Sequence, residues 1–182
     1  MTPVAHHVVD SPVGPLTLVA RHGVLTGLYM DGQRHRPDPG RHGVADPGPF
    51  TSAVEQLAEY FTGGRTVFEL TLATDGTEFQ RLVWAELARI PYGETISYGE
   101  LARRVGRPGA ARAVGLANGR NPIGIIVPCH RVIGATGDLT GYGGGTLRKR
   151  QLLDHERGQR APALWGPAPR SGSTGSVTVP LA

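Results

Sequence analysis

Residues 121–132 read Asn-Pro-Ile-Gly-Ile-Ile-Val-Pro-Cys-His-Arg-Val, and the rest of the chain is best understood from them. An apolar run ends at Pro128, so we expect the backbone to pass through a core and to emerge at a kink directly before Cys129. This places the thiol at the mouth of a pocket, where His130 and Arg131 favour the nucleophilic thiolate. The residues alone leave open that Cys129 is a small buried hydrophobe and His130 a structural side chain.

The segment before this stretch predicts two short helices joined by a turn. Ser97-Tyr98-Gly99-Glu100 is a capping-box pattern, so Ser97 is expected to cap a helix that stops at Gly106. A turn at 107–109 and a helix of small residues over 111–119 follow. This order is the outline of a helix-turn-helix, although an ordinary helical hairpin packed through alanine fits it equally.

The first third of the chain has the pattern of an antiparallel meander. Short apolar runs at 4–9, 15–20 and 24–30 are separated by tight-turn residues. Residues 31–49 are a loop rich in Pro, Gly and charge, without periodicity. The sequence therefore predicts three strands followed by a long irregular loop.

A helix and a linker are expected between the two halves. Residues 52–55 form a second capping-box pattern, which predicts that a helix begins at Ser52 and continues to Phe61. Residues 66–72 alternate, as in a strand or in the extended start of a linker. Helical spacing resumes at Phe79, so we expect the domain boundary near residues 73–77.

The charge is unevenly distributed along the 182 residues. The formal net charge is +4, but residues 1–77 hold five basic and eight acidic residues, and residues 78–160 hold 13 basic and seven acidic ones. A basic second half is expected of a chain that meets a polyanion such as nucleic acid. A solvated arginine-rich surface explains the same numbers, so charge alone leaves both interpretations open.

Composition restricts the class of protein further. No apolar run approaches the length of about 18 residues that a membrane span needs, so we expect neither a membrane nor a secreted protein. Cys129 is the single cysteine, which excludes an internal disulfide framework and a multi-cysteine metal site. A reducing cytoplasm is the expected location.

Five stretches, taken in order, carry a resemblance to a known family. They are PYGETISYGELA at 91–102, ARAVGLANGRNP at 111–122, IVPCHRVI at 126–133, GYGGG at 141–145 and RQLLDHE at 150–156. They resemble the O6-alkylguanine-DNA alkyltransferases, or methylated-DNA–protein-cysteine methyltransferases, and IVPCHRVI is similar to the active-site motif of that family. The similarity covers residues 76–157, and the N-terminal stretch SPVGPLTL at 11–18 also resembles sequences of this family.

The resemblance implies an α+β fold with two domains. Residues 1–75 would form a small N-terminal antiparallel-sheet domain of the ribonuclease-H-like type. Residues 76–157 would form a C-terminal helical domain with a winged helix-turn-helix, which carries the DNA-binding surface and the active site. Residues 158–182 are rich in Pro, Gly and Ser and are expected to be a disordered tail.

The resemblance also implies which residues do the chemistry. Cys129 resembles the thiolate that takes the alkyl group from O6-alkylguanine in one irreversible, stoichiometric step. His130 resembles the base that deprotonates it through a bound water, and Glu156 the carboxylate that orients this histidine. Asn121 resembles an asparagine that braces the turns around the cysteine. Tyr98 resembles a tyrosine that helps to swing the nucleotide out and hydrogen-bonds the purine.

For DNA binding, the resemblance implies an arginine finger at Arg112. Chemistry at an atom inside a duplex needs the base to be flipped out, and a planar, permanently charged side chain is suited to fill the gap. Ala111 and Asn118 on the same helix are expected to contact DNA, although Asn118 replaces an apolar residue of some relatives.

The guanine pocket is expected around Val132 and Tyr142. Gly143 stands where some relatives carry a serine, so a backbone amide would replace that hydroxyl. No N-terminal cysteine cluster is present, so neither the zinc site of some relatives nor any cofactor is expected. The expected partner is double-stranded DNA containing alkylated guanine, bound by a monomer. Cooperative assembly on DNA and repair of O4-alkylthymine stay open.

Three other functions compete with this interpretation. A non-catalytic alkyl-lesion sensor shares the fold but replaces the cysteine, which is intact here. A cysteine hydrolase usually has its histidine far from the thiol in sequence, whereas His130 is adjacent to Cys129. A plain winged-helix regulator explains the basic half but leaves the Pro-Cys-His-Arg run of residues 128–131 without a role.

Overall fold

In the computed structural model, which describes residues 4–158, the three N-terminal strands form the predicted meander. β1 (Val4–Val9), β2 (Leu16–Arg21) and β3 (Val24–Met30) pair in antiparallel fashion in chain order. The sheet order is β3-β2-β1-β4, and the short β4 (Val44–Ala45) pairs with β1 in parallel. The antiparallel sheet is thus confirmed over its three long strands, with a short parallel strand added at the edge.

The long loop after β3 is more ordered than its composition indicates. Besides β4 it holds two 3₁₀ turns, η1 (Pro39–Arg41) and η2 (Gly48–Phe50). Because η2 runs directly into α1 (Thr51–Phe61), this helix starts without a side-chain cap. The prediction that Ser52 caps it is therefore wrong: the Ser52 hydroxyl accepts a hydrogen bond from Gln56 Nε2, one turn later, at 3.2 Å.

Residues 66–72 form no regular strand. The Gln56 side chain takes both backbone groups of Glu69, donating to its carbonyl at 3.1 Å and accepting from its N–H at 2.8 Å. This holds the segment against α1, and the segment pairs with the sheet through one isolated bridge, between Leu25 and Leu72. Of the two interpretations left open by the sequence, the extended start of a linker is the one observed.

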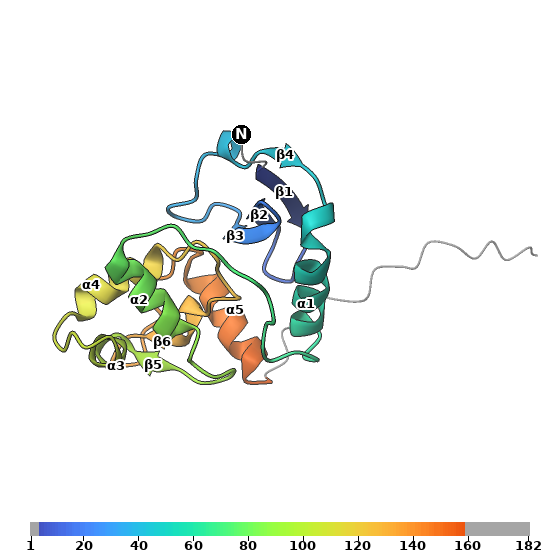
Figure 1. Ribbon diagram of the computed structural model, residues 1–182. Coiled ribbons are helices and arrows are strands. Elements are labelled where there is room, and N and C mark those ends of the chain that lie inside the picture. The colour runs from blue at the N-terminus through green and yellow to red at the C-terminus, as the bar shows by residue number, and fades with distance from the viewer. Residues whose placement is uncertain (1–3, 159–182) are drawn as a thin grey trace, which may run out of the picture.

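The helical half begins with α2 (Glu78–Leu87), capped by a capping box in which Thr77 and Gln80 exchange hydrogen bonds. Ser97 caps α3 as predicted, accepting from the N–H of Glu100 at 3.1 Å. The remaining elements are β5 (Ile96–Ser97), α3 (Tyr98–Arg104), α4 (Ala111–Gly119), η3 (Cys129–Arg131), β6 (Val132–Ile133) and α5 (Thr146–Glu156). β5 and β6 pair in parallel, and α3 and α4 pack against each other beside α2. The sheet domain and the helical domain lie side by side, with α1 alongside the sheet (Figure 1).

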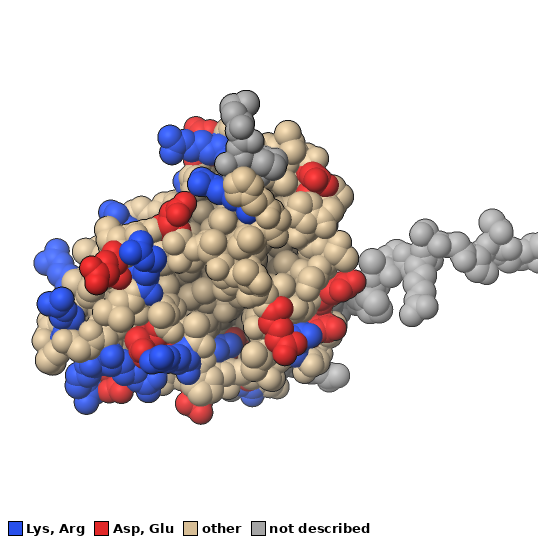
Figure 2. Space-filling model, viewed as in Figure 1, with Lys and Arg blue, Asp and Glu red and all other residues tan. Residues whose placement is uncertain are grey.

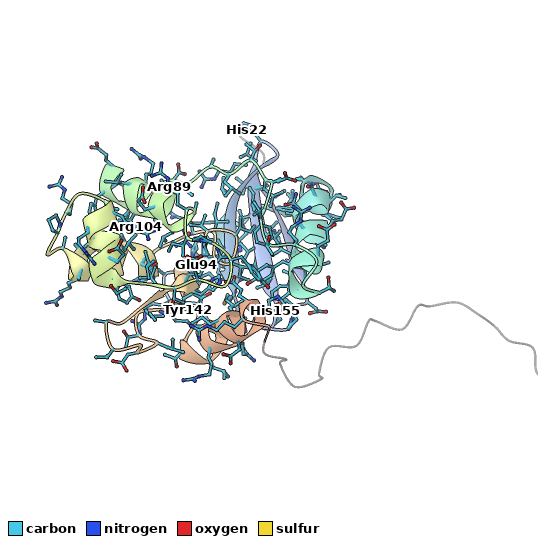
Figure 3. All side chains as sticks on the ribbon, turned by 90° about the horizontal axis from the view of Figure 1, so that it is seen from below. His22, Arg89, Glu94, Arg104, Tyr142 and His155 are labelled. Atoms are coloured by element: carbon cyan, nitrogen blue, oxygen red, sulfur yellow. The ribbon has the colours of Figure 1, made fainter. Side chains whose placement is uncertain are left out.

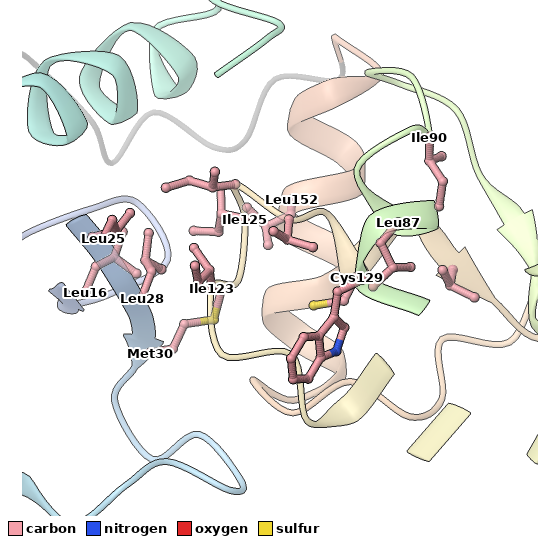
Figure 4. Close-up of a cluster of buried hydrophobic side chains, with 14 of the residues drawn as sticks. Leu16, Leu25, Leu28, Met30, Leu87, Ile90, Ile123, Ile125, Cys129 and Leu152 are labelled. Atoms are coloured by element: carbon pink, nitrogen blue, oxygen red, sulfur yellow. The ribbon is translucent and has the colours of Figure 1, made fainter. Parts of the chain in front are cut away.

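One hydrophobic core joins the two halves and positions the segment that leads to Cys129. The Leu28 backbone on β3 donates to the carbonyl of Pro122 at 2.9 Å and accepts from the N–H of Gly124 at 3.2 Å. Ile123 and Ile125 are fully buried, and Figure 4 shows them between β3 and α5. The expected passage through the core is therefore observed.

This passage is a series of tight turns rather than an extended strand. The N–H of Val127 donates to the carbonyl of Ile123 at 3.0 Å, and Ile125 has a φ of +69°. A β-branched residue in the left-handed region is strained, so the surrounding core must hold it there. The turns bring the chain to Pro128 with Cys129 facing inward.

Two expectations concern the molecule as a whole. No helix among residues 4–158 is long and apolar enough to cross a membrane. The predicted disordered tail falls, from residue 159 onward, outside the part of the chain that the structure describes.

Candidate active site

Cys129 opens η3, and its buried side chain lines a small pocket. The pocket has a volume of about 10 Å³, the space of a single water molecule. Asn121, predicted to brace the cysteine, and Tyr142 and Gly143, predicted to wall the base pocket, line it with Cys129, and so does Asn118, which was predicted to contact DNA instead. The structure therefore brings the cysteine together with both asparagines and with the loop after residue 140.

His130 turns inward beside the cysteine and is fully buried. Its Nε2 lies 2.8 Å from Oε1 of Glu156, whereas Nδ1 has no partner among the described protein groups. With a proton on Nε2, Nδ1 is an acceptor. Burial lowers the pKa of His130, although the Glu156 carboxylate opposes the shift. The imidazole is thus neutral near pH 7, with one nitrogen ready to take a proton.

Glu156, the last residue of α5, receives hydrogen bonds on both carboxylate oxygens. Oε1 accepts from His130 Nε2 and the Tyr60 hydroxyl, both at 2.8 Å, and from Arg131 Nη2 at 2.9 Å. Oε2 accepts from Arg131 Nε at 2.8 Å and from the N–H of Gly93 at 3.1 Å. Burial alone would raise the pKa of Glu156, but the hydrogen bonds from His130 and Arg131 outweigh it and hold the pKa well below its usual range.

The resting state of Cys129 differs from the sequence expectation. The Arg131 guanidinium donates its hydrogen bonds to the Glu156 carboxylate and, at 2.5 Å, to the carbonyl of Ile90, rather than to the thiol. Burial raises the pKa of the Cys129 thiol, although a hydrogen bond from Asn121 and the charge of Lys149 oppose the rise. The expectation that Arg131 favours the thiolate is therefore wrong, and a thiol that is protonated at rest needs a base.

The two asparagines hold the backbone around the thiol. Asn121 Nδ2 donates to the carbonyl of Val127 at 2.7 Å, and its Oδ1 accepts from the N–H of Ile123 at 3.1 Å. Asn118 Nδ2 donates to the carbonyl of Cys129 at 3.3 Å. Asn118 is only 1% exposed, so its side chain faces the site rather than the molecular surface.

Tyr98 and Lys149 form a second polar pair near the site. The Tyr98 hydroxyl donates to the carbonyl of Thr140 at 2.7 Å, and Lys149 Nζ lies 5.6 Å from the centre of its ring. Burial raises the pKa of Tyr98 to about 12 and lowers that of Lys149 to about 8. Lys149 Nζ also donates to the carbonyl of Val132 at 2.5 Å. Val132 itself is fully buried and does not line the pocket.

The loop after Thr140 closes the pocket from the side of the sheet. The Tyr142 hydroxyl reaches Met30 Sδ at 3.7 Å, and the carbonyl of Gly143 accepts from the N–H of Arg34 at 2.9 Å. Figure 3 shows Tyr142 at one end of α5 and His155 at the other, next to α1. Both domains therefore contribute to the walls of the site.

Sequence reasoning missed two residues of this site. Tyr60 lies in a predicted amphipathic helix, where an aromatic residue is usually core, and no local signal shows that its hydroxyl is used. Lys149 is the only lysine of the chain, and the Arg-Lys-Arg run around it has the pattern of a solvated helix face. The one sequence signal for a special role of this residue is that a chain otherwise rich in arginine has a lysine here.

A basic surface lies over α3 and α4. Its exposed arginines are Arg103, Arg104, Arg107, Arg112 and Arg120. Figure 2 shows Lys and Arg gathered at the end of the molecule formed by these two helices. Arg112 and the half-buried Ala111 lie in the first turn of α4, outside the pocket of Cys129.

The described residues thus combine a sheet domain, a helical domain and a cysteine whose neighbouring imidazole is paired with a carboxylate. This is the arrangement of a protein that uses a thiol nucleophile with a built-in base. Residues 4–74 match the family model described as "6-O-methylguanine DNA methyltransferase, ribonuclease-like domain". Residues 78–158 match the model described as "6-O-methylguanine DNA methyltransferase, DNA binding domain". The chain belongs to the 6-O-methylguanine DNA methyltransferase family.

Relatives are similar over nearly their whole length. A methylated-DNA–protein-cysteine methyltransferase of Mycobacterium tuberculosis is 58% identical, over 88% of this chain and 96% of the relative. One of Methanosarcina acetivorans is 49% identical, over 82% of this chain and 96% of the relative. The crystal structure of Mycobacterium tuberculosis OGT in complex with DNA matches with a TM-score of 0.80 and 59% identity, over 87% of this chain and 96% of that one. The expected fold class is thereby confirmed.

Proposed function

We propose that this chain repairs O6-alkylguanine in double-stranded DNA by transferring the alkyl group to Sγ of its own Cys129. The observation that carries the proposal is the series formed by Cys129, His130 and Glu156. A pocket-lining thiol is followed by a buried imidazole that has one nitrogen on a carboxylate and the other without a partner. Membership of the family supplies the substrate class.

The first step is removal of the thiol proton. Burial keeps Cys129 protonated at rest, so a base must act when the substrate is in place. We assign this role to His130, which takes the proton at Nδ1 through one bridging water. Glu156 remains ionised and stabilises the imidazolium that forms, as the carboxylate does in other nucleophile–histidine–carboxylate triads.

The second step is an in-line displacement at the alkyl carbon. A lone pair of the Cys129 sulfur forms the new S–C bond, and the electrons of the C–O6 bond leave with guanine as an anion. Tyr98, whose hydroxyl has a pKa of about 12, keeps its proton at neutral pH and hydrogen-bonds the leaving base, which takes up a proton from water. The product is a thioether without an easy reverse reaction, so each molecule acts once.

DNA binding is assigned to the basic surface of α3 and α4, used as a helix-turn-helix. The target nucleotide is flipped out, and Arg112 enters the base stack beside Ala111 to fill the gap. Tyr142 and Gly143 wall the base pocket. Val132 takes part through its backbone carbonyl, which Lys149 holds.

Asn118 is assigned a different role from the DNA contact implied by resemblance. Its side chain is buried and holds the carbonyl of Cys129. Together with Asn121, which braces the preceding turn, it keeps the thiol in place while the base is bound.

The remaining parts of the proposal follow from the same chemistry. No cofactor is needed, because Cys129 is both nucleophile and acceptor. We assign the monomer as the working unit, with residues 1–75 as the sheet domain and 76–157 as the DNA-binding and active-site domain. The protein is placed in the cytoplasm, where a lone thiol stays reduced.

The test is the mass of the protein after it is mixed with one equivalent of duplex carrying a single O6-methylguanine. We expect one added methyl group on the peptide that contains Cys129, and none with an unmodified duplex. Cys129→Ala is the matched control, which should bind the lesion without any gain in mass. Binding by the wild type without a mass gain would instead favour the lesion sensor. The same assay with a duplex that carries O4-methylthymine tests whether that base is also a substrate.

A further inference from the structure

Tyr60 brings the N-terminal domain into direct contact with the carboxylate of the active site. It lies on α1, is fully buried, and donates its hydroxyl proton to Glu156 Oε1 on α5 at 2.8 Å. Of the side-chain groups that donate to this carboxylate, it is the one that comes from the sheet domain within residues 4–158.

Packing explains the ring of Tyr60 but not its hydroxyl. The ring lies among aromatic neighbours, 5.1 Å from Phe61 and 5.4 Å from Phe68 between centroids, and a phenylalanine would fill the same space. A buried hydroxyl needs a partner, and it is supplied here by the group that orients His130. The His155 ring nitrogen Nε2, 2.7 Å from the carbonyl of Tyr60, further fixes the end of α1 against α5.

The hydroxyl shares its acceptor atom with the imidazole. Oε1 receives Tyr60, His130 Nε2 and Arg131 Nη2 at 2.8, 2.8 and 2.9 Å. Each donor draws on the negative charge of one oxygen, so a bond from Tyr60 leaves less of that charge to stabilise a protonated His130. Burial and the Glu156 charge keep the pKa of Tyr60 well above its ordinary value, so the hydroxyl stays a donor throughout the working pH range.

We propose that Tyr60 is a positioning residue for alkyl transfer: its hydrogen bond fixes Glu156 Oε1 against His130 and limits the basicity of that imidazole. The sheet domain then takes part in the reaction without touching substrate. This inference rests on the proposed function, because it assigns His130 as the base.

The experiment compares Tyr60→Phe with the wild type in single-turnover transfer from a duplex with one O6-methylguanine, as a function of pH. Loss of the bond leaves more negative charge on Glu156 to stabilise a protonated His130, so the pKa of the imidazole rises and the neutral base is reached only at higher pH. The rising limb of the rate profile follows deprotonation of the base, so we expect it to move up by about 0.5 to 1 pH unit, the contribution of one hydrogen bond to a charged group. The ¹⁵N-detected titration of the His130 imidazole should move up by a similar amount.

The matched control is Tyr92→Phe. Tyr92 packs edge-on against Tyr60, with 6.0 Å between ring centroids, and has no hydrogen bond to Glu156 among the described residues. Its profile should coincide with that of the wild type. In a His130→Ala background, Tyr60→Phe should change nothing further, because its effect passes through the imidazole.

A second variant keeps the test decisive if Tyr60→Phe does not fold. Tyr60→3-fluorotyrosine retains the ring and makes the hydroxyl a stronger donor, so the pKa of His130 should fall and the limb should move to lower pH. Unshifted profiles and an unshifted His130 titration in both variants, with transfer intact, would overturn the role of Tyr60 alone. Absence of transfer in the wild type would instead overturn the proposed function, and the titration would still report on the hydrogen bond.

Discussion

Replacing Glu156 by glutamine should destabilise the fold strongly although the two side chains have the same shape. The Glu156 side chain is fully buried and its carboxylate accepts hydrogen bonds from four residues. An amide has one acceptor oxygen, and its NH₂ group would face donors on the other side. The Arg131 guanidinium, also buried, would lose its counter-charge.

The size of the effect follows from the burial of this ion pair. Removing one partner of a buried pair costs about 3–5 kcal/mol, because the other charge is left uncompensated. With a urea dependence of about 2 kcal/mol per molar, the unfolding midpoint of Glu156→Gln should fall by roughly 1.5–2.5 M. The imidazole of His130 would lose its anionic partner in the same variant, so alkyl transfer should slow as well.

Urea unfolding followed by tryptophan fluorescence measures this difference, and Glu100→Gln is the matched control. Glu100 pairs with Arg103 at 2.6 Å and with Arg104 at 3.0 Å, but its side chain is 33% exposed. The loss there should be about 0–1 kcal/mol, as for other surface pairs. If Glu156→Gln lost no more than Glu100→Gln, the reasoning from burial would be refuted.

Three further predictions concern pH, charge near the thiol and DNA. The folded-state pKa of Glu156 lies below its unfolded value near 4.3, so the stabilisation by its carboxylate is present above that pH and is lost as the pH falls. Burial lowers the pKa of His130, so stability is also lost as the pH falls below about 6.5. Urea unfolding at successive pH values should therefore show a steady loss of stability towards acid pH. Lys149→Met should raise the pKa of the Cys129 thiol, since it removes a nearby positive charge, and thiolate absorbance against pH would show no change if that charge is without effect. Arg112→Ala should slow transfer from duplex at least about tenfold, because unstacking a base costs a few kcal/mol, yet leave transfer from a free alkylguanine base unchanged; equal losses on both substrates would contradict the finger.

Local patterns predicted the elements whose signals are local. The three long strands and the cap at Ser97 follow from alternation and capping, which act within a few residues. The error at Ser52 has a physical cause of the same kind, because a 3₁₀ turn leads into α1 and makes a side-chain cap unnecessary. Residues 66–72 alternate like a strand, but the Gln56 side chain takes the backbone bonds that a sheet would have used.

Site residues that belong to a sequence motif were predictable, and residues that reach the site through contacts between distant parts of the chain were not. Asn121 was expected to brace the turn and has the contacts for it. The inward direction of Asn118 could have been read from its spacing of four residues from Val114, which places both on the buried face of α4. Tyr60 lies 96 positions from its partner Glu156, and no pattern in a single sequence joins two such positions.

The loop that closes the Cys129 pocket has a consequence for how tightly a lesion is bound. Tyr142, Gly143 and Gly144 line the pocket of Cys129, so the position of the loop around Tyr142 sets how much room a base finds beside the thiol. That loop is tied to the sheet domain by Gly143, whose carbonyl accepts from the N–H of Arg34, and by Arg148 of α5, which donates to the carbonyls of Gly144 at 3.3 Å and of Asp31 at 2.6 Å. The observed association constant is then the association constant of the open form multiplied by the fraction of molecules in that form. Each tenfold decrease in this fraction weakens binding by about 1.4 kcal/mol. Weakening these ties would expose the thiol more and raise the observed affinity for the lesion.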